Sequence, residues 1–172
     1  MLNAIADPGT AINPVMTGIV SLILALGSPA VKTRRDAAAR LGTSGDPAAV
    51  APLVQALTDT HPSVRREAAQ ALGRLDDDRA VPGLIAALAD PDPEVRAGAI
   101  AALGKLKDRR AVIPLAGCLN DRDDWIRTGA AEVLGRLGDG RAEGPLMKAA
   151  DDPFEGVREA AARALARIRK KA

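Results

Sequence analysis

The sequence predicts an all-α fold, a right-handed α-solenoid built from five stacked helix hairpins. A motif recurs along the chain with a period of 31 residues. Each copy holds two segments whose apolar residues follow helical spacing. The apolar residues are nearly all small or aliphatic, since the 172 residues include one Trp, one Phe and no Tyr. A fixed period above ~20 residues is typical of arrays in which each repeat packs on its neighbours.

The period is defined by columns of similar residues that recur every 31 positions without an insertion. One column holds Leu41, Leu72, Leu103, Leu134 and Leu165, followed by glycine in the first four copies and by Ala166 in the last. We divide residues 19–172 into copies 19–49, 50–80, 81–111, 112–142 and 143–172, which form one domain. Residues 1–18 form an N-terminal flank whose apolar pattern is compatible with a longer first helix.

The first helix of each copy, the A helix, has a clear start signal in the second copy. Asp46 precedes Pro47, and this pair favours an N-cap followed by proline at the first helical position. Val50, Leu53, Val54 and Leu57 then fall on one helical face. The same capping position holds Asp77, Asp108 and Asp139 in the next three copies.

The second helix of each copy, the B helix, follows after a short turn. In the second copy Val64, Ala68, Leu72 and Leu75 form its apolar stripe. Two helices of ~12 residues with one apolar face each cannot bury those faces alone, and they become stable only by stacking on neighbouring pairs.

The segment from Asp90 to Gly104 reads Asp-Pro-Asp-Pro-Glu-Val-Arg-Ala-Gly-Ala-Ile-Ala-Ala-Leu-Gly. It resembles HEAT repeats, and especially the short bacterial and archaeal class called phycobilisome-lyase HEAT-like. The resemblance covers nearly the whole chain and implies that the B helices line a concave face on which partner proteins dock. It also implies an alternative function as an accessory subunit of a phycobilin-lyase-like chromophore enzyme.

An aspartate and an arginine recur six residues apart around the turn between the A and B helices. The pairs are Asp59 with Arg65, Asp90 with Arg96, Asp121 with Arg127 and Asp152 with Arg158. We expect these residues to form a structural ladder that links neighbouring copies, because arginine suits bidentate recognition of carboxylates. The alternative is a phosphate-binding stripe. The first copy has Ser28 in place of the aspartate, so the ladder is expected to stop there.

Two aromatic residues interrupt columns that are otherwise polar or small. Trp125 and Phe154 lie near the start of the B helix in adjacent copies and form a candidate hot spot for a partner protein. The alternative is that Trp125 packs locally over the neighbouring turn. Gly98 and Gly129 share a column in the B helix and predict a smooth strip on which a partner helix can pack. The alternative is that glycine arose there by sequence drift, at a position where packing does not constrain the residue.

Polar and basic B-helix residues complete the expected partner-binding surface. They are Arg66, Gln70, Arg74, Lys105 and Arg136. Arg35, Arg66, Arg74, Lys105, Arg136, Arg163 and Arg167 would serve a nucleic-acid-binding alternative. A net charge of +2 argues against that alternative, since such proteins usually carry a strongly basic surface.

The first A helix is more apolar than its place in the array explains. Val20 and Leu24 occupy columns that hold Ala, Pro, Gly, Gln or Lys in most other copies, and Met16 precedes them. Because a terminal repeat needs a polar outer face, we expect this patch to be covered by a second copy of the chain or by a partner, rather than by residues 1–10 alone.

No residue pattern predicts catalysis. His61 is the only histidine and there is no His-Glu dipeptide, which excludes the iron site of HEAT-type deoxyhypusine hydroxylases. The single cysteine, Cys118, stands in an alanine column and is expected to be a buried core residue. We expect a non-enzymatic scaffold or adaptor that binds another protein, without cofactor or metal.

The sequence also favours a cytoplasmic location. One cysteine cannot form an internal disulfide. The uncharged stretch from Pro8 to Val31 lacks a basic flank and is interrupted by Pro14, Gly18 and Gly27. It is therefore expected to be neither a signal peptide nor a membrane span.

Overall fold

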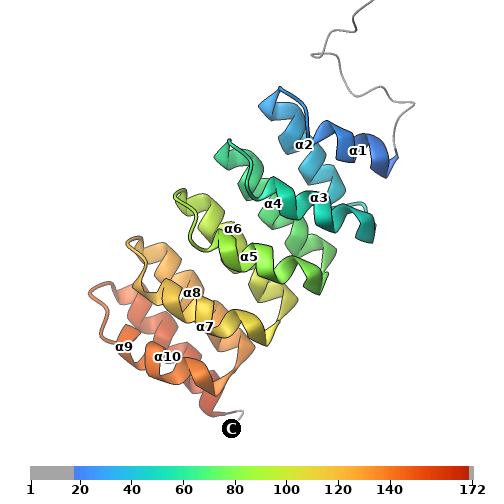
Figure 1. Ribbon diagram of the computed structural model, residues 1–172. Coiled ribbons are helices and arrows are strands. Elements are labelled where there is room, and N and C mark those ends of the chain that lie inside the picture. Colours follow the sequence, from blue (N-terminus) through green and yellow to red (C-terminus); the bar gives the residue numbers. More distant parts are fainter. Residues whose placement is uncertain (1–17, 171–172) are drawn as a thin grey trace, which may run out of the picture.

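The computed structural model describes residues 18–170, which form a row of helix hairpins stacked side by side (Figure 1). The A helices are α1 (Ile19–Ala25), α3 (Val50–Ala56), α5 (Val81–Ala87), α7 (Val112–Gly117) and α9 (Glu143–Ala149). The B helices are α2 (Val31–Leu41), α4 (Pro62–Leu75), α6 (Pro93–Leu106), α8 (Asp124–Leu137) and α10 (Glu155–Arg169). The predicted all-α solenoid of five hairpins is confirmed. The expected extension of the first helix lies outside the described residues.

A capped 3₁₀ turn precedes each A helix after the first. These turns are η1 (Pro47–Ala49), η2 (Asp78–Ala80), η3 (Arg109–Ala111) and η5 (Gly140–Ala142); a further turn, η4 (Cys118–Asn120), follows α7. Asp46 accepts a hydrogen bond from the backbone N–H of Ala48 at 2.8 Å, and Asp108 accepts one from Arg110 at 2.7 Å. The predicted aspartate caps are therefore confirmed, although each starts a 3₁₀ turn that leads into the α-helix.

A continuous apolar core runs through the stack between the A and B layers. The leucines of the B helices, Leu41, Leu72, Leu103 and Leu134, are fully buried, as are Leu53, Leu84, Leu115 and Leu146 of the A helices. Alanines fill most of the remaining core positions. Each hairpin therefore buries its apolar faces mainly against its neighbours, as expected for a repeat array.

Glycines bring three pairs of successive B helices unusually close together. A Cβ atom added to Gly42, Gly73 or Gly135 would lie 2.6, 2.9 or 2.7 Å from the Cα atom of Ala71, Ala102 or Ala164 in the next copy. Successive B helices pack directly on one another, whereas A helices contact the 3₁₀ turn of the next copy. The B helices thus form the more closely spaced layer, and we infer that they line the inner side of the solenoid.

An arginine ladder links the copies at the turns between A and B helices. Arg65 donates two hydrogen bonds to the carboxylate of Asp90, from Nε at 2.7 Å and from Nη2 at 2.8 Å. The same bidentate pairing joins Arg34 to Asp59, Arg96 to Asp121 and Arg127 to Asp152, with Nε–Oδ2 distances of 2.7, 2.8 and 2.8 Å. The predicted structural ladder is therefore present.

The partners in the ladder differ from the sequence prediction. Each arginine binds the carboxylate of the aspartate 25 residues downstream, in the next copy, and not the one six residues upstream. The upstream residue contributes its backbone carbonyl, as in the bond from Arg65 Nη1 to Asp59 at 2.9 Å. The carboxylate of Asp59 accepts the N–H of His61 at 2.8 Å and faces Arg34 in the preceding copy. This turn geometry explains the shift in partner.

The two ends of the ladder also differ from expectation. The first copy takes part although it has Ser28, because Arg34 requires only the aspartate of the second copy, and Ser28 supplies its carbonyl oxygen at 2.9 Å. The incomplete rung lies at the other end. Arg158 donates to the carbonyls of Asp152 and Pro153, and no carboxylate in residues 18–170 pairs with it.

The ladder and the caps keep the aspartates ionised. Hydrogen bonds from Arg34 and Arg127 lower the pKa of Asp59 and Asp152. Burial alone would raise the pKa of Asp90, but the hydrogen bonds from Arg65 and from a backbone N–H outweigh it and the pKa is lowered. At the start of η2, hydrogen bonds from the side chain and backbone of Arg79 lower the pKa of Asp77 to about 2.

These lowered pKa values predict acid-induced unfolding. A carboxylate whose pKa is lower in the folded chain stabilises it above the unfolded value of ~3.9, and this contribution is lost as the pH falls through the folded pKa. We expect the melting temperature to hold steady down to pH ~5 and to fall steadily towards pH ~2. Thermal unfolding followed by circular dichroism across this range checks it. Asp77→Asn should show a shallower decline, and a melting temperature independent of pH would contradict the prediction.

Candidate functional site

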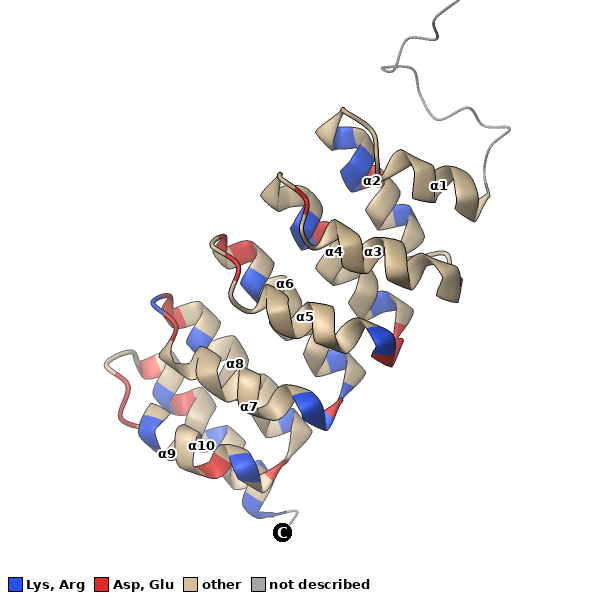
Figure 2. Ribbon diagram, viewed as in Figure 1, with Lys and Arg blue, Asp and Glu red and all other residues tan. Residues whose placement is uncertain are grey.

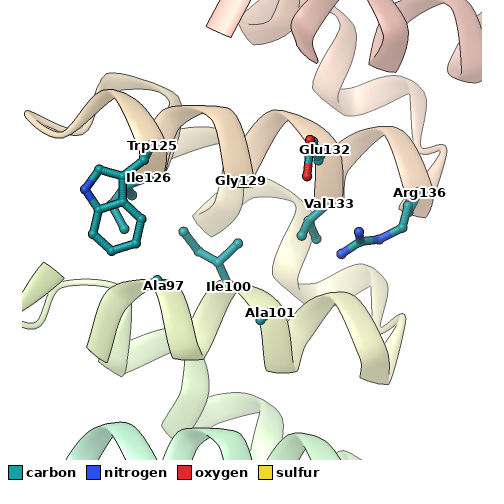
Figure 3. Close-up of a pocket in the computed structure, with 9 residues that line it drawn as sticks. All are labelled: Ala97, Ile100, Ala101, Trp125, Ile126, Gly129, Glu132, Val133 and Arg136. Carbon is teal, nitrogen blue, oxygen red and sulfur yellow. The ribbon is translucent and has the colours of Figure 1, made fainter. Parts of the chain in front are cut away.

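A groove lies between α6 and α8 on the B-helix surface (Figure 3). Its volume is about 260 Å³. It is lined by Ala97, Ile100 and Ala101 of α6 and by Trp125, Ile126, Gly129, Glu132, Val133 and Arg136 of α8. Helix–helix grooves with an apolar lining and a few polar groups are common sites for binding.

Two bulky residues hold α6 and α8 apart at this groove. Ile100 stands in a column that holds Ala38, Ala69, Ala131 and Ala162 in the other copies. Val133 stands in a column that holds Ala71, Ala102 and Ala164. At the other three junctions between B helices, these alanines face a glycine of the preceding copy. A Cβ atom added to Gly104 would therefore meet side-chain atoms, at 3.0 Å from Val133 and 2.7 Å from Arg136. A Cβ atom added to the equivalent glycine at the other junctions would meet the Cα atom of an alanine. The groove therefore exists at this junction because α8 cannot approach α6 as closely as elsewhere.

Small residues leave the space between these bulky side chains open. A Cβ atom on Gly129 would have only Ile100 Cγ2 within contact, at 3.9 Å. Ala97 and Ala101 line the opposite wall. The floor is formed by Ile100, Ile126 and Val133, which are almost completely buried. Because Gly129 has no side chain, an apolar side chain from a partner could rest on this floor without displacing a residue of α8.

The two ends of the groove are chemically different. Trp125, in the first turn of α8, lies at one end beside Ala97, and Arg136, in the last turn, lies at the other (Figure 3). The Trp125 side chain is 42% exposed even though it lines the groove. It thus offers a large apolar surface to a partner, which is the property of an interface hot spot.

Phe154 does not share the groove with Trp125. It is the N-cap residue of α10 and is 52% exposed. The guanidinium carbon of Arg127 lies 5.2 Å from the centre of the Phe154 ring, a cation–π contact with a ladder residue. The two aromatic residues therefore mark the starts of neighbouring B helices, but only Trp125 belongs to the cavity.

The predicted smooth strip of glycines is only half present at the surface. Gly98 is buried, and a Cβ atom there would contact Ala69 Cβ at 3.5 Å and the carbonyl oxygen of Arg66 at 3.6 Å. Gly98 faces the preceding copy, whose helix α4 packs closely on α6. Gly129 occupies the same column but faces the wider α6–α8 junction, so it lines the groove and Gly98 does not.

Some of the predicted polar residues of the B helices line the groove or a neighbouring hollow, and the others lie outside both. Arg136 lines the groove, and Arg74 and Lys105 line an adjoining hollow of about 740 Å³. Gln70 is exposed on α4 outside both. Arg66 is half-buried near Glu94, with a nitrogen–oxygen distance of 3.7 Å. Ile100 and Val133 were missed from the sequence, although their departure from alanine columns was a signal that could have found them.

The N-terminal patch is exposed where the structure describes it. Val20 and Leu24 of α1 are 65% and 67% exposed. Met16 lies outside the described residues. The cover expected for this patch stays a prediction.

His61 and Cys118 have local structural roles. His61 is the exposed N-cap of α4, and its Nδ1 accepts a hydrogen bond from the backbone N–H of Ser63 at 3.3 Å. Cys118 is buried as predicted, and burial raises the pKa of its thiol to about 11. Among residues 18–170, no three His, Cys, Asp or Glu side chains are grouped as metal ligands. In the same part of the chain, no helix combines the length and apolar character needed to cross a membrane.

Comparison with known proteins places this architecture. A chain from the complex of CpcE and CpcF of phycocyanin lyase from Nostoc sp. PCC7120 superimposes with a TM-score of 0.76 and 31% identity, covering 95% of this chain and 71% of that one. A designed armadillo repeat protein in complex with the peptide (KR)4 gives a TM-score of 0.68 at 19% identity, covering 87% and 81%. Human deoxyhypusine hydroxylase gives 0.51 at 20% identity, covering 88% and 84%. The last two likenesses concern the fold alone.

Sequence comparison gives a family. A search of curated protein sequences returned no significant match. A profile of HEAT repeats matches residues 19–90, 53–134 and 121–172, which together span the whole array. The chain therefore belongs to the HEAT-repeat family.

Proposed function

We propose that the chain is a non-catalytic scaffold or adaptor that binds another protein on its B-helix face. The observation that carries this proposal is the α6–α8 groove, which combines a buried apolar floor with an exposed Trp125. Tryptophan at the edge of a preformed pocket is typical of residues that dominate binding energy at protein interfaces.

The groove fits a side chain better than it fits a small-molecule cofactor. Pockets for drug-sized ligands measure ~300–1,000 Å³ and enclose most of the ligand. The groove is below that range, at about 260 Å³, and it is open along the helix surface. One or two apolar side chains of a partner would fill it, while the rest of the partner would extend over the neighbouring B helices.

Blocking the groove should weaken partner binding strongly without unfolding the chain. Trp125→Ala removes the exposed aromatic surface, and we expect a loss of about 2 kcal/mol or more in binding free energy. Gly129→Met places a side chain in the groove and replaces a helix-interior glycine, so it should bind poorly while the chain remains as stable or becomes more stable by ~1 kcal/mol. The measurement is affinity capture from the native host, followed by calorimetric titration of the captured partner.

The matched control is Gly117→Met. Gly117 lies at the end of α7, and no atom would lie within 4 Å of its Cβ. This variant should capture the same partner as the unmodified chain. The proposal fails if a partner binds equally well to the unmodified chain and to both groove variants, Trp125→Ala and Gly129→Met.

A second candidate function is an accessory subunit of a chromophore lyase. It is favoured by the 31% identity, over 95% of this chain, with a chain of the CpcE–CpcF complex of phycocyanin lyase. Under this candidate the partner would be a second subunit of such an enzyme. The identity of the captured protein therefore discriminates between the two candidates.

We also propose Val20 and Leu24 as a second contact surface, separate from the groove. Both side chains are exposed on α1, and α1 carries no charged residue. Another copy of the chain or a partner protein would cover them, because exposed apolar clusters on soluble proteins commonly mark interaction sites.

A further inference from the structure

A row of cations runs along the last turns of the B helices. It consists of Arg74, Lys105, Arg136 and Arg167, one from each of α4, α6, α8 and α10, and is called the basic row below. Arg74 pairs with Glu67 at 2.6 Å. Within residues 18–170, no carboxylate lies within 4.0 Å of the charged nitrogens of the other three residues.

Arginines near the starts of the A helices show the opposite situation. Arg79, Arg110 and Arg141 lie 2.6, 2.6 and 2.9 Å from the carboxylates of the aspartates that cap those turns. Their charges are therefore compensated, and Figure 2 shows acidic and basic residues interspersed around the array. A helix C-terminus supplies about half a negative charge, which offsets only part of a full cation. The basic row thus keeps a net positive charge.

The basic row lines three adjoining hollows that share Arg136. The first, of about 740 Å³, is also lined by Arg74 and Lys105. The second is the α6–α8 groove. The third, of about 260 Å³, lies between α8 and α10 and is also lined by Arg163 and Arg167. Positive charge and apolar surface are therefore continuous across α4, α6, α8 and α10.

The spacing of the row matches one kind of peptide. Packed helices lie ~8–10 Å apart, so successive cations of the row are separated by about that distance. A peptide in the polyproline II conformation has three residues per turn and rises ~3.1 Å per residue, so every third side chain points the same way at intervals of ~9 Å. Acidic residues at every third position would meet successive B helices in register.

We propose that the basic row and the α6–α8 groove together bind an extended acidic segment of the partner protein. Carboxylates at every third position contact Lys105, Arg136 and Arg167, and an apolar side chain between them enters the Arg136 end of the groove, beside Ala101 and Val133. This inference rests on the proposed function and adds the chemistry of the bound segment.

Nucleic acid fits the same surface less well. Each strand of a nucleic-acid duplex carries a phosphate every ~3.4 Å, so several phosphates would lie between successive cations, where Glu132 and Asp76 line the hollows. A peptide with acidic residues only at every third position places neutral residues there. The net charge of the whole chain is only +2. Neutralising about three phosphates releases few counterions and gives weak binding at physiological salt.

The test uses synthetic peptides of about 12 residues with the repeating sequence Glu-Leu-Pro, which favours the polyproline II conformation. A matched peptide carries Gln in place of Glu. Binding is measured by fluorescence anisotropy at ~0.15 M salt, where exposed charges are partly screened. We expect the Glu peptide to bind about tenfold more tightly than the Gln peptide, and the double variant Lys105→Glu, Arg136→Glu to reduce its affinity by about tenfold or more.

The control variant is Lys32→Glu with Lys148→Glu, which changes the net charge equally at exposed positions outside the basic row. It should bind the Glu peptide with little change. The inference is overturned if the Glu and Gln peptides bind alike, if neither binds, if both double variants act alike, or if single-stranded DNA binds the row more tightly than the Glu peptide. Equal binding of both peptides that is lost in Gly129→Met would leave the proposed function intact, and the capture experiment tests that function independently.

Discussion

Replacing Arg96 by alanine should lower the free energy of unfolding by about 3 kcal/mol or more, the cost typical of removing one partner of a buried ion pair. Arg96 is 5% exposed and binds the carboxylates of Asp121 and Asp123 as well as the carbonyl of Asp90. Its loss leaves the carboxylate of Asp121, at the junction of two copies, without a counter-charge. Urea denaturation followed by circular dichroism measures the effect.

Arg158→Ala is the matched control for this experiment. Arg158 occupies the same column and donates to carbonyls of its own copy, at 2.8 and 2.9 Å, but it pairs with no carboxylate in the described residues. We expect a loss of about 1 kcal/mol, as for ordinary hydrogen bonds at a partly exposed site. Equal losses in the two variants would show that the link between copies contributes nothing to stability.

Gly135→Ala should also destabilise the chain strongly. A Cβ atom at this position would lie 2.7 Å from the Cα and 2.8 Å from the Cβ of Ala164, so α8 and α10 would have to separate. Overpacking costs about 1–3 kcal/mol and occasionally more. Because the clash here is with backbone, we expect a cost at the upper end, which outweighs the gain of ~1 kcal/mol from replacing a helical glycine. Thermal unfolding gives the difference, and we expect a clear fall in melting temperature.

The corresponding change at Gly104 separates backbone contact from side-chain contact. There the nearest atoms are Nη2 of Arg136 at 2.7 Å, at the end of an exposed and flexible side chain, and the methyl groups of Val133. These side chains can adjust, so Gly104→Ala should change stability by less than ~1 kcal/mol. If Gly135→Ala proved as mild as Gly104→Ala, the B helices would not be as closely packed as described.

The period and the apolar columns were sufficient to predict the fold, because each copy repeats the same packing demands. They could not predict the ladder partners. Asp59 and Asp90 lie six residues before and 25 residues after Arg65, and since these separations together equal the period, both aspartates belong to one column. Only the direction of the carboxylate at the turn distinguishes them, and that direction depends on how neighbouring hairpins stack.

The candidate site was predicted in part for a related reason. Trp125, Gly129 and Arg136 were identified because they depart from their columns or form a basic one. Ile100 and Val133 were missed because aliphatic residues are expected throughout such a chain, and their effect arises only from their meeting across one junction. Gly98 and Gly129 likewise look equivalent in sequence, but the spacing of the helices that face them is different.

The central claim, that a partner binds over the α6–α8 groove, can be tested through the intrinsic fluorescence of Trp125. It is the only tryptophan in the chain, which has no tyrosine, so the emission of the free chain reports on the groove alone. The emission of the partner alone is subtracted from that of the complex. In the free chain the partly exposed indole should be quenched readily by acrylamide. On addition of saturating captured partner, we expect quenching to fall severalfold and the emission maximum to shift to shorter wavelength, as the partner excludes water from the groove. Formation of the complex with quenching unchanged from that of the free chain would show that the partner binds elsewhere.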